Sequence, residues 1–217
     1  MAKVKGAVLG INSGKIGQVC YRVTKGTQFA GRMPVVSDNR KYSSLQMDNF
    51  ERFKVLGRLG ASFMGASRIG LKHLMTKAYD NAVSVFVQKN QGAVSVMGGE
   101  AEVDYGSLKC ADGTLPQPGF GNASFAEPQR VSVTYSTSAD APDADAQDKV
   151  YIFIYQPDTR QAMLSAPALR TTGTIEIRVP SSWTGLSVHV YGFAVGDGRE
   201  NKGMIAESTY IGTGTIA

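Results

Sequence analysis

Cysteine, histidine and tryptophan are scarce in this sequence, and their scarcity limits the chemistry that it can carry out. The 217 residues include two cysteines, two histidines and one tryptophan. Cys20 and Cys110 lie far apart in the sequence with no second ligand near either, which argues against a disulfide framework or a metal site. The sequence therefore predicts no metal and no cofactor.

Catalytic motifs are missing as well. The chain contains no Gly-x-Ser-x-Gly, P-loop, His-Glu-x-x-His or paired-cysteine motif. His73 lies in a lysine-rich stretch, which predicts an exposed or capping side chain. His189 alternates with Val188 and Val190, which predicts a strand residue that faces solvent. We therefore expect a protein that is not an enzyme.

Charged residues and long apolar runs are also few. Charged residues make up 19% of the chain, while 25 residues are glycine, a composition that excludes a coiled coil, a collagen and charge-driven disorder. No stretch approaches the ~18 apolar residues of a membrane span, and the start of the chain does not resemble an export signal. We expect a protein without a membrane span, located in the cytoplasm or in a virion assembled there.

The net charge of +5 conceals a division of the chain. Residues 1–91 carry fifteen Lys or Arg and four acidic residues, whereas residues 92–217 carry eight and fourteen. The hydrophobic pattern changes at the same point, from hairpin-like and helical segments to repeated apolar alternation. Two explanations remain open: the opposite charges dock the two parts together, or the basic part binds an external acidic partner.

The first part, residues 1–41, is predicted to be a basic, glycine-rich β arm. Thr24-Lys25-Gly26-Thr27 has the pattern of a hairpin turn between two short strands. On the strand before that turn, Val19, Tyr21 and Val23 share one face. The arm is too short to bury a core alone, so we expect it to need a partner surface.

The second part, residues 42–91, is predicted to be helical. Ser43 or Ser44 is a candidate N-cap, and a second helical region is expected from Arg68 to Val87. Apolar residues recur at three- and four-residue spacings, as in a buried stripe; these are Leu45, Phe53, Leu56, Leu59, Phe63 and Met64. Gly57, Ala61 and Gly65 form a row of small residues that favours close approach of another backbone, although the glycines could instead break the helix.

The third part, residues 92–217, is predicted to be an immunoglobulin-like antiparallel β-sandwich, which makes the whole chain α+β. The expected strands are Ala93–Met97, Ala101–Tyr105, Arg130–Tyr135, Val150–Gln156, Ala162–Ala166, Thr174–Val179, Ser187–Val195 and Met204–Ile211. The apolar run 151–155 predicts a central strand, and Trp183 is expected to cover one end of the sandwich. The acidic run Asp140, Asp143, Asp145, Asp148 is similar to a Ca²⁺-ligand run, but its spacing misses the EF-hand pattern. We interpret it as a solvated loop.

The basic arm carries the strongest functional signal in the sequence. Its cationic and aromatic residues could contact phosphates and stack on bases, although no nucleic-acid motif organises them. Its alternating valines could instead add a strand to the sheet edge of another chain. The residues that we predict to make assembly or nucleic-acid contacts are Lys15, Val19, Tyr21, Arg22, Val23, Lys25 and Arg32.

The N-terminal pattern resembles the opening of a family of proteins of unknown function from gut Bacteroidota genomes and their phages or prophages. The similarity lies in Lys5-Gly6, Leu9-Gly10, 13–17 and Tyr21-Arg22, and continues through Ser43-Ser44-Leu45-Gln46, Arg52-Phe53, 148–150, 180–185 and 188–191. Asp38-Asn39-Arg40 departs from the family pattern. The resemblance implies a basic arm, a helical segment and a β-sandwich, and it implies no activity and no functional residue.

These observations lead to three hypotheses. The first is a non-enzymatic structural protein, a virion or phage component whose arm contacts other copies of itself or other assembly proteins. The second is a nucleic-acid-binding protein that uses the basic residues of 1–91. The third is an adhesin-like binding module, against which the lack of an export signal argues.

Overall fold

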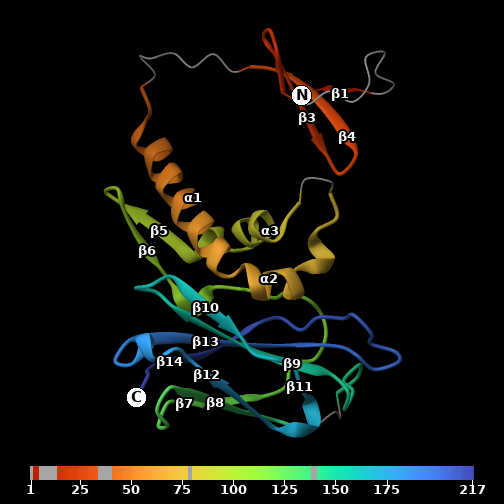
Figure 1. Ribbon diagram of the computed structural model, residues 1–217, viewed down its shortest axis with the longest axis vertical. Coiled ribbons are helices and arrows are strands. Elements are labelled where there is room, and N and C mark those ends of the chain that lie inside the picture. The colour runs from red at the N-terminus through yellow and green to blue at the C-terminus, as the bar shows by residue number, and fades with distance from the viewer. Residues whose placement is uncertain (1, 5–13, 34–40, 78–79, 138–140) are drawn as a thin grey trace. The chain divides into compact units, whose positions relative to one another are not determined.

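The computed structural model describes residues 2–4, 14–33, 41–77, 80–137 and 141–217 (Figure 1). The chain forms two compact units. Residues 1–47 and 76–80 make up the first, and residues 48–75 and 81–217 make up the second. The fold is mixed α+β with antiparallel sheets, as predicted, whereas the division into three domains at residues 42 and 92 stays a prediction. No helix in these ranges is long and apolar enough to cross a membrane.

The first unit is built on a four-stranded antiparallel sheet. Its strands are β1 (Ala2–Val4), β2 (Gly14–Ile16), β3 (Val19–Thr24) and β4 (Thr27–Arg32), in the order β1-β4-β3-β2. The predicted hairpin turn is confirmed between β3 and β4. Lys25 and Gly26 adopt φ angles of 48° and 74°, the left-handed pair that a two-residue hairpin turn requires.

The helical segment is shorter and more broken than predicted. Its elements are α1 (Ser44–Ser62), α2 (Met64–Gly70), a 3₁₀ turn (Lys72–Leu74) and α3 (Ala82–Lys89). Ser43 is the N-cap of α1, since Gln46 N–H donates to Ser43 Oγ and Ser43 N–H donates to Gln46 Oε1. Helix α3 begins five residues later than Lys77 because Asn81 and Ser84 form a capping box.

The predicted buried stripe holds only along the C-terminal half of α1. Leu56, Leu59 and Phe63 are buried, but Leu45 is 74% exposed and Phe53 is 50% exposed. Phe63, between α1 and α2, packs its ring against four others at centroid distances of 4.7–5.4 Å. This aromatic contact holds the helices on the sheet below them.

The prediction of a close-contact row at Gly57, Ala61 and Gly65 is wrong. Ala61 and Gly65 are exposed, and a Cβ added at Gly57 or Gly65 would meet no atom within 4 Å. The close approach occurs instead at Gly70, where a Cβ would stand 2.6 Å from the carbonyl oxygen of Cys110. Spacing alone identified a row of small residues but could not tell which glycine faces another backbone.

Gly57 faces open space and Gly70 faces backbone, so the same substitution should have opposite effects at these two helical glycines. Gly57→Ala should stabilise the protein by about 0.5–1 kcal/mol, because alanine has the higher helix propensity and the new methyl group meets nothing. Gly70→Ala should destabilise it by about 1–3 kcal/mol, because the methyl group collides with backbone. Urea denaturation of the two variants measures both values. Equal effects of the same sign would contradict this assignment of contacts.

The second unit contains two antiparallel sheets and a separate hairpin. The larger sheet has the order β10 (Gln161–Leu164), β9 (Lys149–Gln156), β13 (Ser187–Val195), β14 (Thr209–Thr215), with β11 (Ala168–Leu169) also on β9. The smaller sheet has the order β12 (Thr174–Arg178), β8 (Arg130–Tyr135), β7 (Phe120–Ser124). Strands β5 (Val94–Met97) and β6 (Glu100–Val103) pair with each other as a separate two-stranded sheet.

The central strand β9 separates two hydrophobic cores. Its odd-numbered residues Phe153 and Tyr155 join the core under the helices, whereas Ile152 and Ile154 join the core between the two sheets. A strand that is buried on both faces reads as a continuous apolar run, which is why 151–155 predicted a central position. The layers are therefore helices, larger sheet and smaller sheet (Figure 1).

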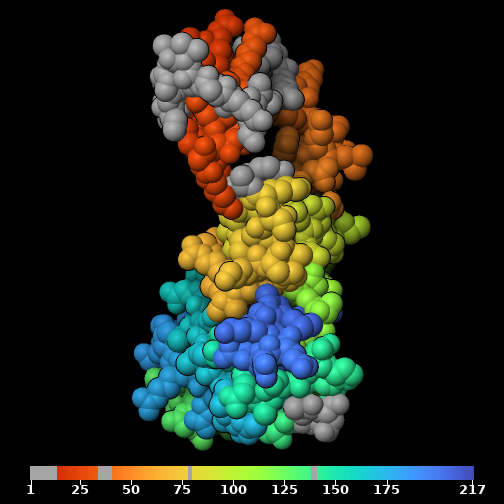
Figure 2. Space-filling view, turned by 90° about the vertical axis from the view of Figure 1, so that its right-hand side faces the viewer, coloured from red at the N-terminus to blue at the C-terminus, as the bar shows by residue number. Residues whose placement is uncertain are grey.

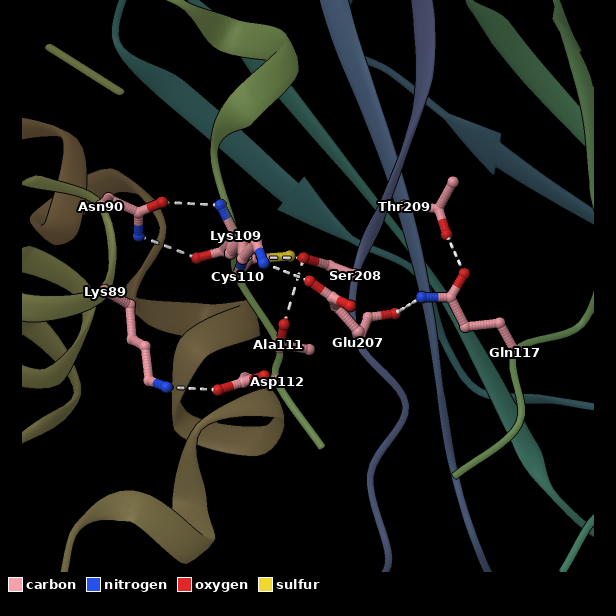
Figure 3. A network of polar contacts seen from close by, with 10 residues as sticks. All are labelled: Lys89, Asn90, Lys109, Cys110, Ala111, Asp112, Gln117, Glu207, Ser208 and Thr209. Carbon is pink, nitrogen blue, oxygen red and sulfur yellow. Dashed lines mark hydrogen bonds and ion pairs between the residues drawn. The ribbon is translucent and has the colours of Figure 1, made fainter. Parts of the chain in front are cut away.

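A network of polar contacts pins the segment between the hairpin and β7 to the rest of the second unit (Figure 3). Asn90, at the end of α3, accepts from Lys109 N–H at 2.7 Å and donates to Lys109 O at 2.9 Å. On the other side, Cys110 N–H donates to Ser208 Oγ at 3.0 Å. Cys110 is fully buried, and burial raises the pKa of its thiol to about 12, so it remains a protonated filler.

Candidate assembly or nucleic-acid surface

Strand register divides the predicted contact residues between the two faces of the N-terminal sheet. Paired residues of an antiparallel ladder share a face, and residues two apart along a strand also share it. Val19 pairs with Arg32 and therefore lies on one face with Tyr21 and Val23. The remaining members lie on the other face or in the turn; these are Lys15, Arg22 and Lys25.

The face that carries Val19 is mainly apolar, with Arg32 and Gln28 as its polar members, and it is incompletely covered. Ile16 of β2 pairs with Val19, and Ala30 of β4 pairs with Tyr21. Ile16 is 58% exposed and Val23 is 39% exposed. A single sheet cannot bury an apolar face without a second layer. This face therefore has the character of a contact surface.

The opposite face carries cations beside an aromatic ring. Arg22 pairs with Phe29, and Lys15 pairs with Cys20, so Lys15 and Arg22 are diagonal neighbours. Both cationic side chains are exposed, and Phe29 is half-buried. Exposed guanidinium and ammonium groups next to a ring can contact phosphates and a stacked base. The sequence grouped these residues with the valines, but the register places Lys15 and Arg22 on the opposite face and leaves Arg32 on the face of the valines.

Strand addition by Val19, as the sequence suggested, is not supported by the register. Val19 lies on β3, an inner strand whose backbone is paired with Ile16 on one side and Arg32 on the other. The edges of this sheet are β1 and β2, each three residues long. A neighbouring strand would therefore have to pair with β1 or β2, and Val19 would contribute only its side chain.

The two histidines occupy different environments. His73 is exposed, as predicted. His189 is half-buried rather than solvent-facing: its ring stacks on Tyr105 at a centroid distance of 4.1 Å, and Nδ1 lies 3.0 Å from Tyr210 Oη. Burial lowers the pKa of His189. Because Tyr105 comes from a turn 84 residues earlier in the chain, nothing in the local alternation could indicate the cover over this strand.

The second unit also contains an open hollow of about 630 Å³ that sequence reasoning missed. Figure 2 shows the yellow helical surface bordering the blue segment that follows β13, and residues of both segments line this hollow. Arg68, Lys72 and His73 come from the helical side, and Ile205 comes from the other. Within the described ranges, no three His, Cys, Asp or Glu side chains are grouped to hold a metal ion.

Comparison with known proteins identifies a family. No curated protein matches the chain. The sequence pattern of a family of unknown function, DUF6266, matches residues 11–212, which covers β2, β3 and β4 of the N-terminal sheet, the helices and nearly all of the two sheets of the second unit. The chain belongs to the DUF6266 family of unknown function.

Proposed function

We propose that this protein is a non-enzymatic structural component of an assembly, a phage virion above all, and that its N-terminal sheet contacts neighbouring subunits. The observation that carries the proposal is the apolar face of that sheet, on which Ile16 and Val23 are exposed. Burying such a face against another subunit is favourable by about 25 cal/mol for each Å² of apolar surface. Assembly of virion proteins in the cytoplasm fits the composition of the chain.

The arrangement of the larger and smaller sheets of the second unit supports an immunoglobulin-like sandwich as the body of this component. We count the strands in chain order from β7 and leave out the two-residue strand β11. The smaller sheet then holds the first, second and fifth strands, and the larger sheet holds the third, fourth, sixth and seventh. This division is close to the immunoglobulin arrangement, in which strands A, B, E and D oppose C, F and G, but it departs at the fourth strand, since β10 lies on the sheet that corresponds to C, F and G. Such sandwiches serve as rigid bodies that present loops and termini to partners.

Nucleic-acid binding is the second candidate function. The observation that favours it is the pair of exposed cations, Lys15 and Arg22, on the same face as Phe29. Binding through this face would be largely electrostatic. The logarithm of the binding constant would then fall by about 0.7–0.9 per phosphate contact for each unit of the logarithm of salt concentration.

Two matched double variants separate these functions, because Ile16 and Val23 lie on one face of the sheet and Lys15 and Arg22 lie on the other. Ile16→Lys with Val23→Lys changes only exposed side chains of the apolar face, and Lys15→Glu with Arg22→Glu changes only the basic face. We expect the first pair to convert an oligomer into monomers in light scattering, and the second pair to leave the oligomer intact at moderate salt. Circular dichroism checks that both variants keep the fold.

Two results would overturn the proposal. A wild-type chain that is strictly monomeric at all salt concentrations would exclude assembly through this sheet. Loss of DNA or RNA retention in the Lys15→Glu, Arg22→Glu variant, with no change of oligomer size in the Ile16→Lys, Val23→Lys variant, would assign the sheet to nucleic-acid binding.

A further inference from the structure

A small pocket in the second unit is lined by hydrogen-bond donors. Its volume is about 220 Å³, and α1, the end of β6, β9 and the turn between β9 and β10 contribute to its wall. The polar residues of this wall are Arg58, Tyr105, Tyr155 and Arg160. The described lining contains no carboxylate and no amide side chain. Guanidinium groups donate and do not accept, so the pocket offers positive charge and donors to whatever enters it.

The Tyr155 hydroxyl has no partner in the described parts of the chain. Tyr155 is 3% exposed, and its ring packs on Phe63 at a centroid distance of 5.1 Å. No described residue forms a hydrogen bond with its hydroxyl. The oxygen is not sealed off either, since the sealed side-chain atoms without a partner are those of Ser67 and Asn201. The hydroxyl therefore opens into the pocket that Tyr155 lines.

This hydroxyl is a donor at neutral pH. Burial raises the pKa of Tyr155 to about 12, and burial also raises the pKa of the neighbouring Tyr105. Both phenols therefore keep their protons. Most buried polar groups in native proteins have a hydrogen-bond partner, so an unpartnered donor at the wall of a pocket points to an acceptor that the pocket receives.

Two guanidinium groups line the same pocket. Arg58 lies on α1, and Arg160 lies on the turn between β9 and β10. Both side chains are exposed, and neither forms an ion pair with a described acidic residue. Asp158 of the same turn accepts instead from Gln156 Nε2 at 2.9 Å. The two positive charges are thus available to a ligand.

The turn that carries Arg160 is fixed in an uncommon conformation. The φ angle of Arg160 is 56°, in the left-handed region that residues other than glycine rarely adopt. Ser62 Oγ, on α1, donates to the backbone oxygen of Arg160 at 2.9 Å. Thr159 N–H donates to Oε1 of the fully buried Gln156 at 2.5 Å. Backbone strain of this kind persists where the surroundings enforce it, and it clusters at ligand sites.

We propose that this pocket binds the phosphate group of a small organic phosphate ester. Guanidinium groups form paired hydrogen bonds with phosphate oxygens, and the donors here come from three places, α1, β9 and the β9–β10 turn. Three separate donors suit the three free oxygens of a phosphate ester better than the two oxygens of a carboxylate. Two cations also match its charge of about −1.5 to −2. The carbon part of the ester would lie on the apolar wall, to which Val55, Leu59 and Val103 contribute.

Calorimetric titration of the full-length protein with phenyl phosphate tests the proposal. We expect saturable binding of one molecule per chain, with a dissociation constant of about 1 mM or below, as is usual for a ligand of this size. Two further probes divide the ligand into its parts. Inorganic phosphate lacks the carbon part and phenol lacks the anion, so each should bind about tenfold more weakly or worse.

Two variants test the donors, each with a matched control. Tyr155→Phe removes only the unpartnered hydroxyl, so it should weaken binding by about tenfold or more without lowering Tm. Tyr135→Phe is its control, because the Tyr135 hydroxyl donates to the backbone oxygen of Leu169, away from the pocket. Arg160→Asn removes the guanidinium with a residue that tolerates left-handed backbone, and it should weaken binding by about tenfold or more. Arg199→Asn is its control, because Arg199 is exposed in the β13–β14 loop.

Each outcome bears on the site. Saturable binding that both pocket variants weaken and both controls preserve supports it. Absence of saturable binding to the wild-type protein at phenyl phosphate up to about 10 mM overturns it, and so does wild-type affinity in a folded Tyr155→Phe or Arg160→Asn protein. Equal affinity for phenol would mean that the anion is not recognised, and equal affinity for inorganic phosphate that the carbon part is not. Either result overturns the assignment to a phosphate ester.

Arg58→Gln keeps the test decisive if either pocket variant is unfolded in circular dichroism. Arg58 is exposed on α1, and glutamine is compatible with a helix, so this variant should fold. We expect it to weaken binding of phenyl phosphate by about tenfold or more. Wild-type affinity in the Arg58→Gln protein would equally overturn the site.

Discussion

Arg170→Met should destabilise the protein by about 3–5 kcal/mol, because it leaves a buried carboxylate without its cation. The side chain of Arg170 is 2% exposed and that of Asp148 is fully buried, and their ion pair measures 3.0 Å from Nη2 to Oδ2. Arg170 Nη2 also donates to the backbone oxygen of Pro116 at 2.8 Å. The pair therefore fastens three segments, and guanidinium denaturation of the variant should show the full loss.

Arg130→Met is the control for this prediction. Arg130 also pairs with carboxylates, Glu127 and Glu176, each at 3.1 Å, but these ion pairs are exposed to solvent. Exposed pairs contribute about 0–1 kcal/mol, so this variant should change the free energy of unfolding by no more than that. Comparable losses in both arginine variants would mean that burial does not govern the strength of the Arg170 pair.

A double variant distinguishes the pair's own contribution from the penalty of an unpaired charge. Replacing Asp148 and Arg170 together by apolar residues of similar volume removes both charges, and such replacements of buried pairs are often close to neutral. Here Asn201 would also lose an acceptor, so we expect the double variant to remain less stable than wild type. It should nevertheless be more stable than Arg170→Met alone.

The strands that sequence could locate are those whose side chains alternate strongly. β8 and β13 have the predicted bounds, because both alternate β-branched or aromatic residues with polar or small ones. β7, Phe120–Ser124, was missed because Gly, Asn, Ala and Ser give it little strand propensity, and its register with β8 is irregular. β7 is extended because it pairs with β8, and not because its own residues favour a strand.

The last strand was placed too early for a related reason. The prediction ended at Ile211, whereas β14 runs from Thr209 to Thr215 and includes two glycines. Gly214 is there because the ring of Phe125 occupies the space of a side chain, and a Cβ would collide with it. A glycine that admits a neighbouring ring looks, in sequence, like a glycine that ends a strand.

Sequence could predict the candidate sites only where their residues are close together in the chain. The arm residues were identified from the alternation of Val19, Tyr21 and Val23 and from the turn that follows, but their division between two faces depends on register with β2 and β4. Asn201 carried no signal in the sequence, since the bonds that it donates to Asp148 and Asp143 join residues 53 and 58 positions apart. Sequence showed the chemistry available near each turn and could not show which turns meet.

Trp183→Ala should also destabilise the protein by about 3–5 kcal/mol, because the substitution leaves a cavity in the core between the two sheets. Trp183 is fully buried in that core, as the sequence predicted, at the corner between β12 and β13. Its Nε1–H donates to Gln161 Oε1 at 2.9 Å, which links the corner to β10 on the larger sheet. Chemical denaturation followed by far-ultraviolet circular dichroism measures the loss independently of any partner.

Gln161→Ala separates the hydrogen bond from the packing of the ring. Gln161 is exposed, so its removal takes away the bond to Trp183 while leaving the indole in place, and we expect a loss of about 0.5–1.5 kcal/mol. The difference between the two variants then gives the contribution of the buried ring. A loss below about 1 kcal/mol for Trp183→Ala would mean that the corner opens in solution and that the indole is available to a ligand. A loss in the expected range makes the corner a fixed part of the core between the two sheets.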